Sequence, residues 1–320
     1  MKRTLAVALL LACVSAHAQS YPVKPMRWVV PFAPGGGTDM VARPIAQRFS
    51  ERVGQPVTYD NRGGGGGVIA GEIVARAAPD GYTLLVAAVA VMTVNSTLMK
   101  MPFDPLRDFV PITKFAASPN MLAARPGLPA KTVQALIDYA KANPKKLTWA
   151  VSGIGSAGHL AMELFAQNAK IEVVRVVYKG AGPAMLALLT NESDVLFANP
   201  SVFLPHIRNG RLRSVAVAST RRISALPDTP TVIESGFPGF ESGSWYGLAA
   251  PAKTSPAIVT FLHKQVSAVL AQPDLVALLA ADGSYPVLHT PQDFARELRE
   301  ETAKWAKVIR DANIRLQAGG

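Results

Sequence analysis

Residues 26–40, MRWVVPFAPGGGTDM, decide the fold class of this chain. The apolar run at residues 26–32 predicts a buried strand. The glycines at 35–37 allow a tight turn, and a helical pattern then continues over residues 39–53. A strand, a glycine turn and a helix in this order are typical of α/β folds.

The same alternation continues along the chain. Further apolar runs predict strands at residues 82–88, 147–151, 173–178, 195–198 and 214–218. These runs are continuous rather than alternating, which is typical of parallel strands that are buried on both faces. Capped helix starts are predicted at Thr132, Ser255 and Thr290.

Two proline-rich breaks, at residues 102–111 and 227–238, divide the chain, and each precedes an extended segment. Two extended segments suit a chain that crosses between two lobes and returns. We therefore expect lobe 1 to comprise residues 21–118 plus 242–320 and lobe 2 to comprise residues 119–241. Each lobe is predicted to be a mostly parallel sheet flanked by helices.

The composition limits the class of protein. The chain has 320 residues, of which 49% are hydrophobic, enough to build two sizeable cores. Lys and Arg exceed Asp and Glu by 33 to 22, so an anionic partner is the first to test. The basic residues are scattered, which predicts no nucleic-acid binding. A single cysteine excludes internal disulfides and a cysteine-rich metal site.

The N-terminus predicts export to the periplasm. Lys2 and Arg3 precede an apolar run at residues 4–14, and Ala16 and Ala18 form an A-x-A cleavage site. Residues 1–18 are therefore predicted to be a signal peptide. One alternative stays open, because residues 10–13 also resemble a lipoprotein box that would anchor the chain at Cys13.

Two glycine-rich loops are candidate anion sites. Glycines let the backbone approach a ligand closely, and a helix N-terminus offers free N–H groups at the positive end of its dipole. The alternative is that the glycines only make tight turns. Neither loop ends in the G-K-[ST] of a triphosphate site. The candidate residues are Phe32, Ala33, Gly35, Gly36, Gly37, Thr38, Asp39, Gly65 and Gly66.

A third loop, at residues 151–159, contains G-x-G-x-x-G between a predicted strand and a helix. This pattern is a dinucleotide fingerprint. Glu172, however, lies at the start of the next strand rather than at its end, and export removes the chain from the nicotinamide pool. The loop still offers donors to an anion, although His159 could simply begin the helix. The candidate residues are Ser152, Gly153, Gly155, Ser156 and His159.

Two further strand ends carry candidate ligand residues. Tyr178 and Lys179 follow one predicted strand, and Asn199 follows another. Lys179 could equally be a solvated loop charge, and Asn199 a turn residue. Both alternatives stay open.

Catalysis and metal binding find no support in the sequence. The histidines after residue 18 are not spaced for metal ligation. There is no G-x-S-x-G, no H-E-x-x-H and, after cleavage, no thiol. We therefore expect no enzyme activity, no metal and no cofactor.

Taken in order, the motifs match a known family. They are Tyr21-Pro22, the segments at 34–39, 54–57, 79–85, 153–159, 178–180 and 226–231, and the W-x-G-L that begins at Trp245. From residue 21 to its end the chain resembles the Bug, or TctC, proteins. These are periplasmic solute-binding components associated with tripartite tricarboxylate transporters.

The resemblance implies a two-lobe Venus flytrap, a monomer, that clamps a small carboxylate for the transporter's membrane subunits. Carried over, the lobe 1 loops at residues 32–39 and 63–67 would hold the carboxylate. Lobe 2 would contribute residues 152–159, residues 178–180 and Asn199. A periplasmic enzyme or a sensor-partner protein on the same fold is the alternative.

The chain departs from the family pattern at several positions. Val177 replaces a common Pro, Ala198 replaces a common Asp, and residues 88–91 are apolar. With Phe197 and Trp245 nearby, these residues predict an apolar wall. Such a wall would favour aromatic or aliphatic mono- and dicarboxylates over glutamate, aspartate or citrate.

Overall fold

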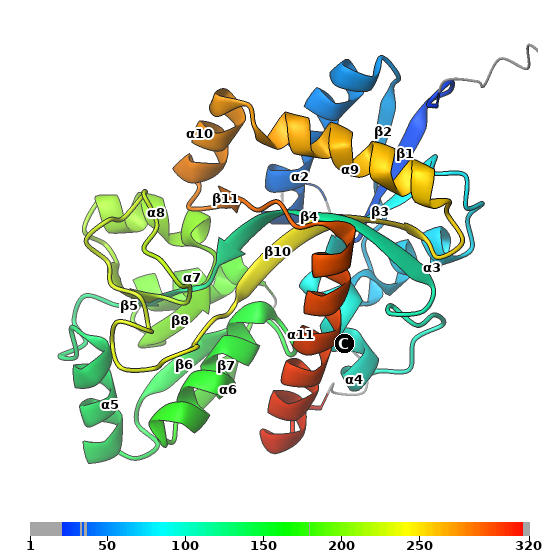
Figure 1. Ribbon diagram of the computed structural model, residues 1–320. Coiled ribbons are helices and arrows are strands. Elements are labelled where there is room, and N and C mark those ends of the chain that lie inside the picture. Colours follow the sequence, from blue (N-terminus) through cyan, green and yellow to red (C-terminus); the bar gives the residue numbers. More distant parts are fainter. Residues whose placement is uncertain (1–20, 33, 35–36, 179, 316–320) are drawn as a thin grey trace, which may run out of the picture.

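The computed structural model describes residues 21–32, 34, 37–178 and 180–315, so the predicted signal peptide and Cys13 lie outside it. The chain forms two sheets with helices packed on their faces (Figure 1). Among the described residues, no helix is long and apolar enough to cross a membrane.

The first sheet has the strand order β11-β4-β10-β3-β1-β2. Strands β1, β2 and β3 pair in parallel, whereas β10, β4 and β11 are antiparallel to their neighbours. The strand bounds are β1 Met26–Val30, β2 Val57–Asn61, β3 Thr83–Ala88, β4 Phe109–Pro119, β10 Gly243–Pro251 and β11 Tyr285–Pro286.

The second sheet has the order β7-β6-β8-β5-β9. Strand β6 pairs in parallel with β7 and β8, and β5 pairs antiparallel with β8 and β9. Both sheets are thus mixed, which corrects the expectation of mostly parallel sheets, because β10 and β11 in the first sheet and β5 in the second run opposite to the other strands. The bounds are β5 Met121–Ala124, β6 Thr148–Val151, β7 Val174–Val177, β8 Val195–Ala198 and β9 Arg213–Val217.

Helices cover both faces of the first sheet. On one face, α2, α9 and α10 share a buried cluster with Trp28 and Phe49. On the other, α3, the π-helix η3 and α11 share a cluster with Trp245 and Trp305. The bounds are α2 Gly37–Val53, η2 Gly65–Gly67, α3 Val68–Ala75, η3 Ala90–Val94, α4 Asn95–Leu98, α9 Pro256–Leu270, α10 Pro273–Ala281 and α11 Pro291–Asp311.

The second sheet is covered in the same way, with α5 and α6 on one face and α7 and α8 on the other. Leu160 of α6 also joins the cluster that contains α11, so the two α/β units share buried apolar contacts. The bounds are α5 Val133–Ala142, α6 Ala157–Ala169, α7 Ala181–Leu189 and α8 Pro200–Arg208.

Local sequence signals explain where these elements begin. Thr132, Ser255 and Thr290 each accept a hydrogen bond from a backbone N–H three residues on, as predicted for helix caps. The six predicted strands are present, as are strands in the two extended segments. The α/β prediction with two sheets is therefore confirmed.

The chain passes between the sheets at two adjacent points (Figure 1). Asn120, between β4 and β5, donates its backbone N–H to the carbonyl of Ser242, which precedes β10, at 2.8 Å. A Cβ on Gly243 would lie 2.6 Å from the carbonyl oxygen of Ser118, so this close approach needs glycine. We keep the predicted ranges as working names for lobe 1 and lobe 2.

Candidate functional site

The carboxyl ends of the parallel strands lead to one cavity between the sheets, here called the cleft cavity. Ligands of open α/β sheets bind at such strand ends. The cleft cavity has a volume of about 280 Å³. It is lined by Phe32, Gly37, Thr38, Asn120, Ser152, Ser156, Ala157, Gly158, Ala181, Ala198, Asn199, Ser201, Val202, Ser244 and Tyr246.

Four helix N-termini meet at the cleft cavity. Gly37 begins α2, Ala157 begins α6, Ala181 begins α7, and Asn199 is the N-cap of α8. The first N–H groups of a helix have no partner within it, and they lie at the positive end of its dipole. None of the described residues that line the cleft cavity carries a charged side chain. The site therefore favours an anion through neutral donors.

Side-chain hydroxyls and amides add further donors. The Ser152 hydroxyl donates to the Ser156 hydroxyl at 3.2 Å, and Ser156 caps α6. From lobe 2, the Asn199 amide nitrogen donates to the Tyr246 hydroxyl at 3.4 Å. The Ser244 hydroxyl donates to Asn199 Oδ1, also at 3.4 Å. Burial raises the pKa of Tyr246 to about 12, so its hydroxyl stays protonated.

The structure brings six of the predicted site residues together in the cleft cavity: Phe32, Gly37, Thr38, Ser152, Ser156 and Asn199. Four other predicted residues, Ala33, Gly35, Gly36 and Lys179, lie outside the described residues.

Five predicted residues belong to the predicted glycine-containing loops or begin the helices that follow them, but they do not line the cleft cavity: Asp39, Gly65, Gly66, Gly153 and Gly155. Asp39 forms an ion pair with Arg43 at 2.7 Å and accepts a hydrogen bond from Asn61. The Gly66 carbonyl accepts from the side chain of Asn95 at 2.9 Å. A ligand contact by these residues stays a prediction.

The structure directs His159 and Tyr178 away from the cleft cavity. His159 is 2% exposed, and its Nδ1 accepts the Gly155 N–H at 3.1 Å while its Nε2 lies 3.4 Å from Glu163. The Tyr178 hydroxyl pairs with that of Ser193 at 3.2 Å. Both side chains are occupied within lobe 2, and for His159 this agrees with the helix-start alternative.

Sequence reasoning missed polar residues at the crossing between the lobes and one on α8. Asn120, Ser201, Ser244 and Tyr246 all line the cleft cavity. The available signal was strand alternation, because Ser244 and Tyr246 are two residues apart in an extended segment and share a face.

The predicted apolar wall is only partly present. Val89, Val91 and Trp245 pack in the cluster with α11, and Phe197 lies in the core of lobe 2. Of the residues proposed for the wall, only Ala198 lines the cleft cavity. Its other apolar lining comes from Phe32, Ala157, Ala181 and Val202.

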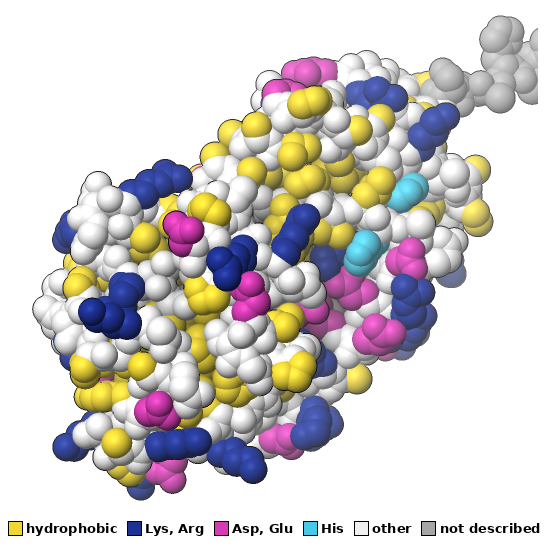
Figure 2. Space-filling model, turned by 60° about the vertical axis from the view of Figure 1, so that its left-hand side comes forward, with side chains coloured by type: hydrophobic (Ala, Val, Ile, Leu, Met, Phe, Trp, Pro, Cys, Tyr) yellow, Lys and Arg dark blue, Asp and Glu magenta, His cyan; other side chains and the backbone are white. Residues whose placement is uncertain are grey.

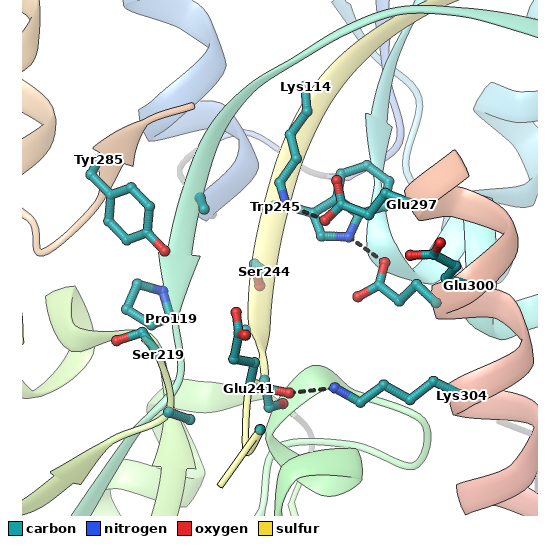
Figure 3. Close-up of a pocket in the computed structure, with 16 residues that line it drawn as sticks. Lys114, Pro119, Ser219, Glu241, Ser244, Trp245, Tyr285, Glu297, Glu300 and Lys304 are labelled. Carbon is teal, nitrogen blue, oxygen red and sulfur yellow. Dashed lines mark hydrogen bonds and ion pairs between the residues drawn. The ribbon is translucent and has the colours of Figure 1, made fainter. Parts of the chain in front are cut away.

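A second cavity, of about 320 Å³, lies between strands β4 and β10 and helix α11 (Figure 3). In this α11 cavity, Lys114 donates to Glu297 at 2.5 Å and the Trp245 indole to Glu301 at 2.5 Å. The Lys304 ammonium donates to the backbone carbonyl of Glu241 at 2.6 Å.

Burial governs the ionisable groups of the α11 cavity. It raises the pKa of Glu301 and lowers the pKa of Lys304. Among the described residues, no group of three or more His, Cys, Asp or Glu could hold a metal ion. Lys114, Glu297, Glu301 and Lys304 of the α11 cavity are each bonded to other groups of the protein, so we take the cleft cavity as the candidate ligand site.

Charge on the surface gives no competing site on the face that Figure 2 shows. There Lys and Arg side chains are dispersed and interleaved with Asp and Glu. The absence of nucleic-acid binding stays a prediction from the sequence.

Two α/β lobes, a double crossing between them and a cavity at the strand ends together define a periplasmic binding protein. The model of one family, described as "Tripartite tricarboxylate transporter family receptor" (TctC), matches residues 41–314. The chain belongs to this family, as its motifs predicted.

Relatives and solved structures agree with this assignment. Protein BugT of Bordetella pertussis is 36% identical over 98% of this chain and 96% of that protein. Rpa4515 of R. palustris, solved with adipate, is 37% identical with a TM-score of 0.81, covering 92% of this chain and 99% of that one. MatC from Rhodopseudomonas palustris, with bound malate, is 33% identical with a TM-score of 0.77, covering 90% and 100%.

Proposed function

We propose that this protein captures a small organic carboxylate in the cleft cavity and presents it to the membrane subunits of a tripartite tricarboxylate transporter. The observation that carries the proposal is the meeting of four helix N-termini in a cavity whose described lining residues are all uncharged. Backbone N–H groups and hydroxyls in that arrangement can hold a carboxylate without a cationic side chain.

The same lining argues against ligands that carry an ammonium group. A buried ammonium needs an anionic or strongly accepting partner, and no Asp or Glu lines the cleft cavity. The acids named with the related structures, adipate and malate, carry no amine. We therefore expect carboxylates without amino groups to bind in preference to glutamate or aspartate.

We further infer that the protein is exported through residues 1–18, works in the periplasm as a monomer and performs no catalysis. The basic and apolar pattern of the N-terminus supports export. Among the described residues, the lining of the cleft cavity offers no His, Cys, Lys, Asp or Glu that could serve as general base or activated nucleophile.

Mass spectrometry of the natively purified chain, residues 19–320, tests the proposal first by looking for a retained acid. A thermal-shift panel of adipate, phthalate, benzoate, citrate and glutamate then follows. An acid at 100 times its Kd should add about 2.7 kcal/mol to the free energy of unfolding. A panel in which only glutamate shifts the melt would contradict the preference for acids without an amine, a panel in which no acid does so would contradict carboxylate capture, and an acid recovered chemically altered would contradict the inferred lack of catalysis.

A further inference from the structure

Three parts of the molecule meet at the hydroxyl of Tyr246. Tyr246 belongs to β10, which enters lobe 1 from the crossing, whereas Asn199 caps α8 in lobe 2 and Gly37 begins α2 in lobe 1. A Cβ on Gly37 would lie 3.0 Å from the Tyr246 hydroxyl and 3.4 Å from the Asn199 amide nitrogen. The absence of a side chain at Gly37 keeps this corner of the cleft cavity open.

The polar groups in this corner satisfy one another poorly. Asn199 to Tyr246 and Ser244 to Asn199 are each 3.4 Å, near the outer limit for a hydrogen bond. Tyr246 is 2% exposed. Buried polar groups with such long contacts gain when a better acceptor arrives.

The corner lacks an acceptor rather than a donor. The Tyr246 hydroxyl keeps its proton, because burial raises its pKa to about 12. The Asn199 amide nitrogen donates to the Tyr246 hydroxyl oxygen, which leaves the hydroxyl's own proton for another acceptor. No carboxylate lines the cleft cavity among the described residues, so this donor suits an oxygen atom of a ligand and not an ammonium group.

A second, separate set of donors comes from the loop before α6 in lobe 2. Ser152 and Ser156 belong to the loop before α6 and are linked to each other at 3.2 Å. No hydrogen bond links this pair to Asn199, Ser244 or Tyr246 among the described residues. The cleft cavity thus carries two hydroxyl groupings, as a ligand with two oxygen-bearing ends would require.

We propose that Tyr246, supported by Asn199 and Ser244, is the specificity-determining residue that binds a second oxygen acceptor of the ligand. The cleft cavity then selects diacids over monoacids with the same carbon skeleton. This inference rests on the proposed function and names the ligand class more closely.

Matched acid pairs test it by titration calorimetry: succinate with butyrate, glutarate with valerate, adipate with hexanoate, and phthalate with benzoate. The wild-type protein should bind the diacid of at least one pair. Tyr246→Phe should weaken that diacid about ten-fold or more, the scale of one hydrogen bond to a charged group, and change the monoacid by less than about two-fold.

Tyr59→Phe is the matched control. The Tyr59 hydroxyl is buried, has no hydrogen-bond partner among the described residues and does not line the cleft cavity. Its removal should leave both affinities unchanged. Ser244→Ala, a second variant, should weaken the diacid in the same direction, and it keeps the test sound if Tyr246→Phe melts early.

The remaining outcomes of these titrations would contradict either this inference or the proposed function. Equal losses for diacid and monoacid, or an unchanged diacid affinity in both cleft variants, overturn the inference while carboxylate capture stands. Binding of monoacids but of none of the diacids would also overturn the inference and leave carboxylate capture standing. If the wild-type protein binds none of these acids, the inference falls together with the proposed function.

Discussion

The two faces of strand β10 have different surroundings. Ser244 and Tyr246 line the cleft cavity, whereas Trp245, between them, packs toward α11. Successive side chains of a strand point to opposite faces, so three adjacent residues serve two environments. Ser244 is the one residue that borders both cavities among the described residues.

The two cavities also differ in charge. Among the described residues, six charged residues line the α11 cavity and none lines the cleft cavity. Paired charges such as Lys114 and Glu297 leave little capacity for a ligand, because each satisfies the other. Neutral donors at helix ends stay available for an anion. We infer that the α11 face holds the crossing together while the cleft face binds.

The largest effect should come from Trp245→Ala. Trp245 is 4% exposed, packs edge-on against Phe294 with ring centroids 5.2 Å apart and donates to Glu301. Its removal should lower the free energy of unfolding by about 3–5 kcal/mol. Denaturant unfolding measures the loss, and calorimetry on the folded variant should return the wild-type Kd.

Tyr246→Phe is the matched variant on the opposite face of the same strand. It should change affinity and leave the free energy of unfolding within about 1 kcal/mol of wild type. If Trp245→Ala weakened ligand affinity as well as the free energy of unfolding, the binding and stabilising roles of the two faces would not be separable.

The second effect in size belongs to the cleft face. Gly37→Val fills the corner between Tyr246 and Asn199, where even a Cβ approaches to 3.0 Å. Affinity for the bound acid should fall about 100-fold or more, equivalent to about 2.8 kcal/mol. Titration calorimetry measures the loss.

Gly182→Val is its control. It makes the same change in the first turn of α7, where a Cβ would meet nothing within 4 Å. Both variants change helix propensity by a similar amount, below about 1 kcal/mol and in favour of Val over Gly. Equal affinities for the two variants would remove the α2 N-terminus from the binding site.

Much of the fold could be predicted because its signals are local. Apolar runs and caps such as Thr132 identify strands and helix starts without knowledge of distant residues. Strand β2 has the polar sequence VTYDN and pairs only with β1 at the sheet edge, so it gives no apolar run. Strand β10 runs antiparallel to its neighbours β3 and β4 because of where the chain re-enters the first sheet, and no local sequence pattern indicates that point.

The site residues also divide into those that the local sequence predicts and those that only the tertiary structure brings to the cleft cavity. Gly37, Ser152 and Asn199 follow or cap predicted elements, so the strand-end rule located them. Ser244 and Tyr246 became part of the cleft cavity only through the crossing of the chain. Tyr178 follows a strand as well, yet its hydroxyl is occupied by Ser193, a pairing between elements that sequence spacing does not reveal.

The smallest effect concerns pH and Glu301. Burial raises the pKa of this carboxyl in the folded protein above its ordinary value of 4.5. The folded state therefore holds the proton more tightly than the unfolded state does, and the free energy of unfolding falls as pH rises from 4.5 to the raised pKa. Above that range the loss is complete.

Glu301→Gln removes this penalty, since the amide is neutral at every pH and its oxygen can still accept from Trp245. The variant should match wild type near pH 4 and exceed it at neutral pH by about 0.5–2 kcal/mol, a common gain for a stabilising substitution. Glu300→Gln, an exposed neighbour on the same cavity, should follow the wild-type curve throughout. The Kd should stay unchanged in both variants at neutral pH, because neither side chain lines the cleft cavity. A ligand affinity that followed the titration of Glu301 would instead place the α11 face within the binding machinery, and the contrast between the two faces of β10 would fail.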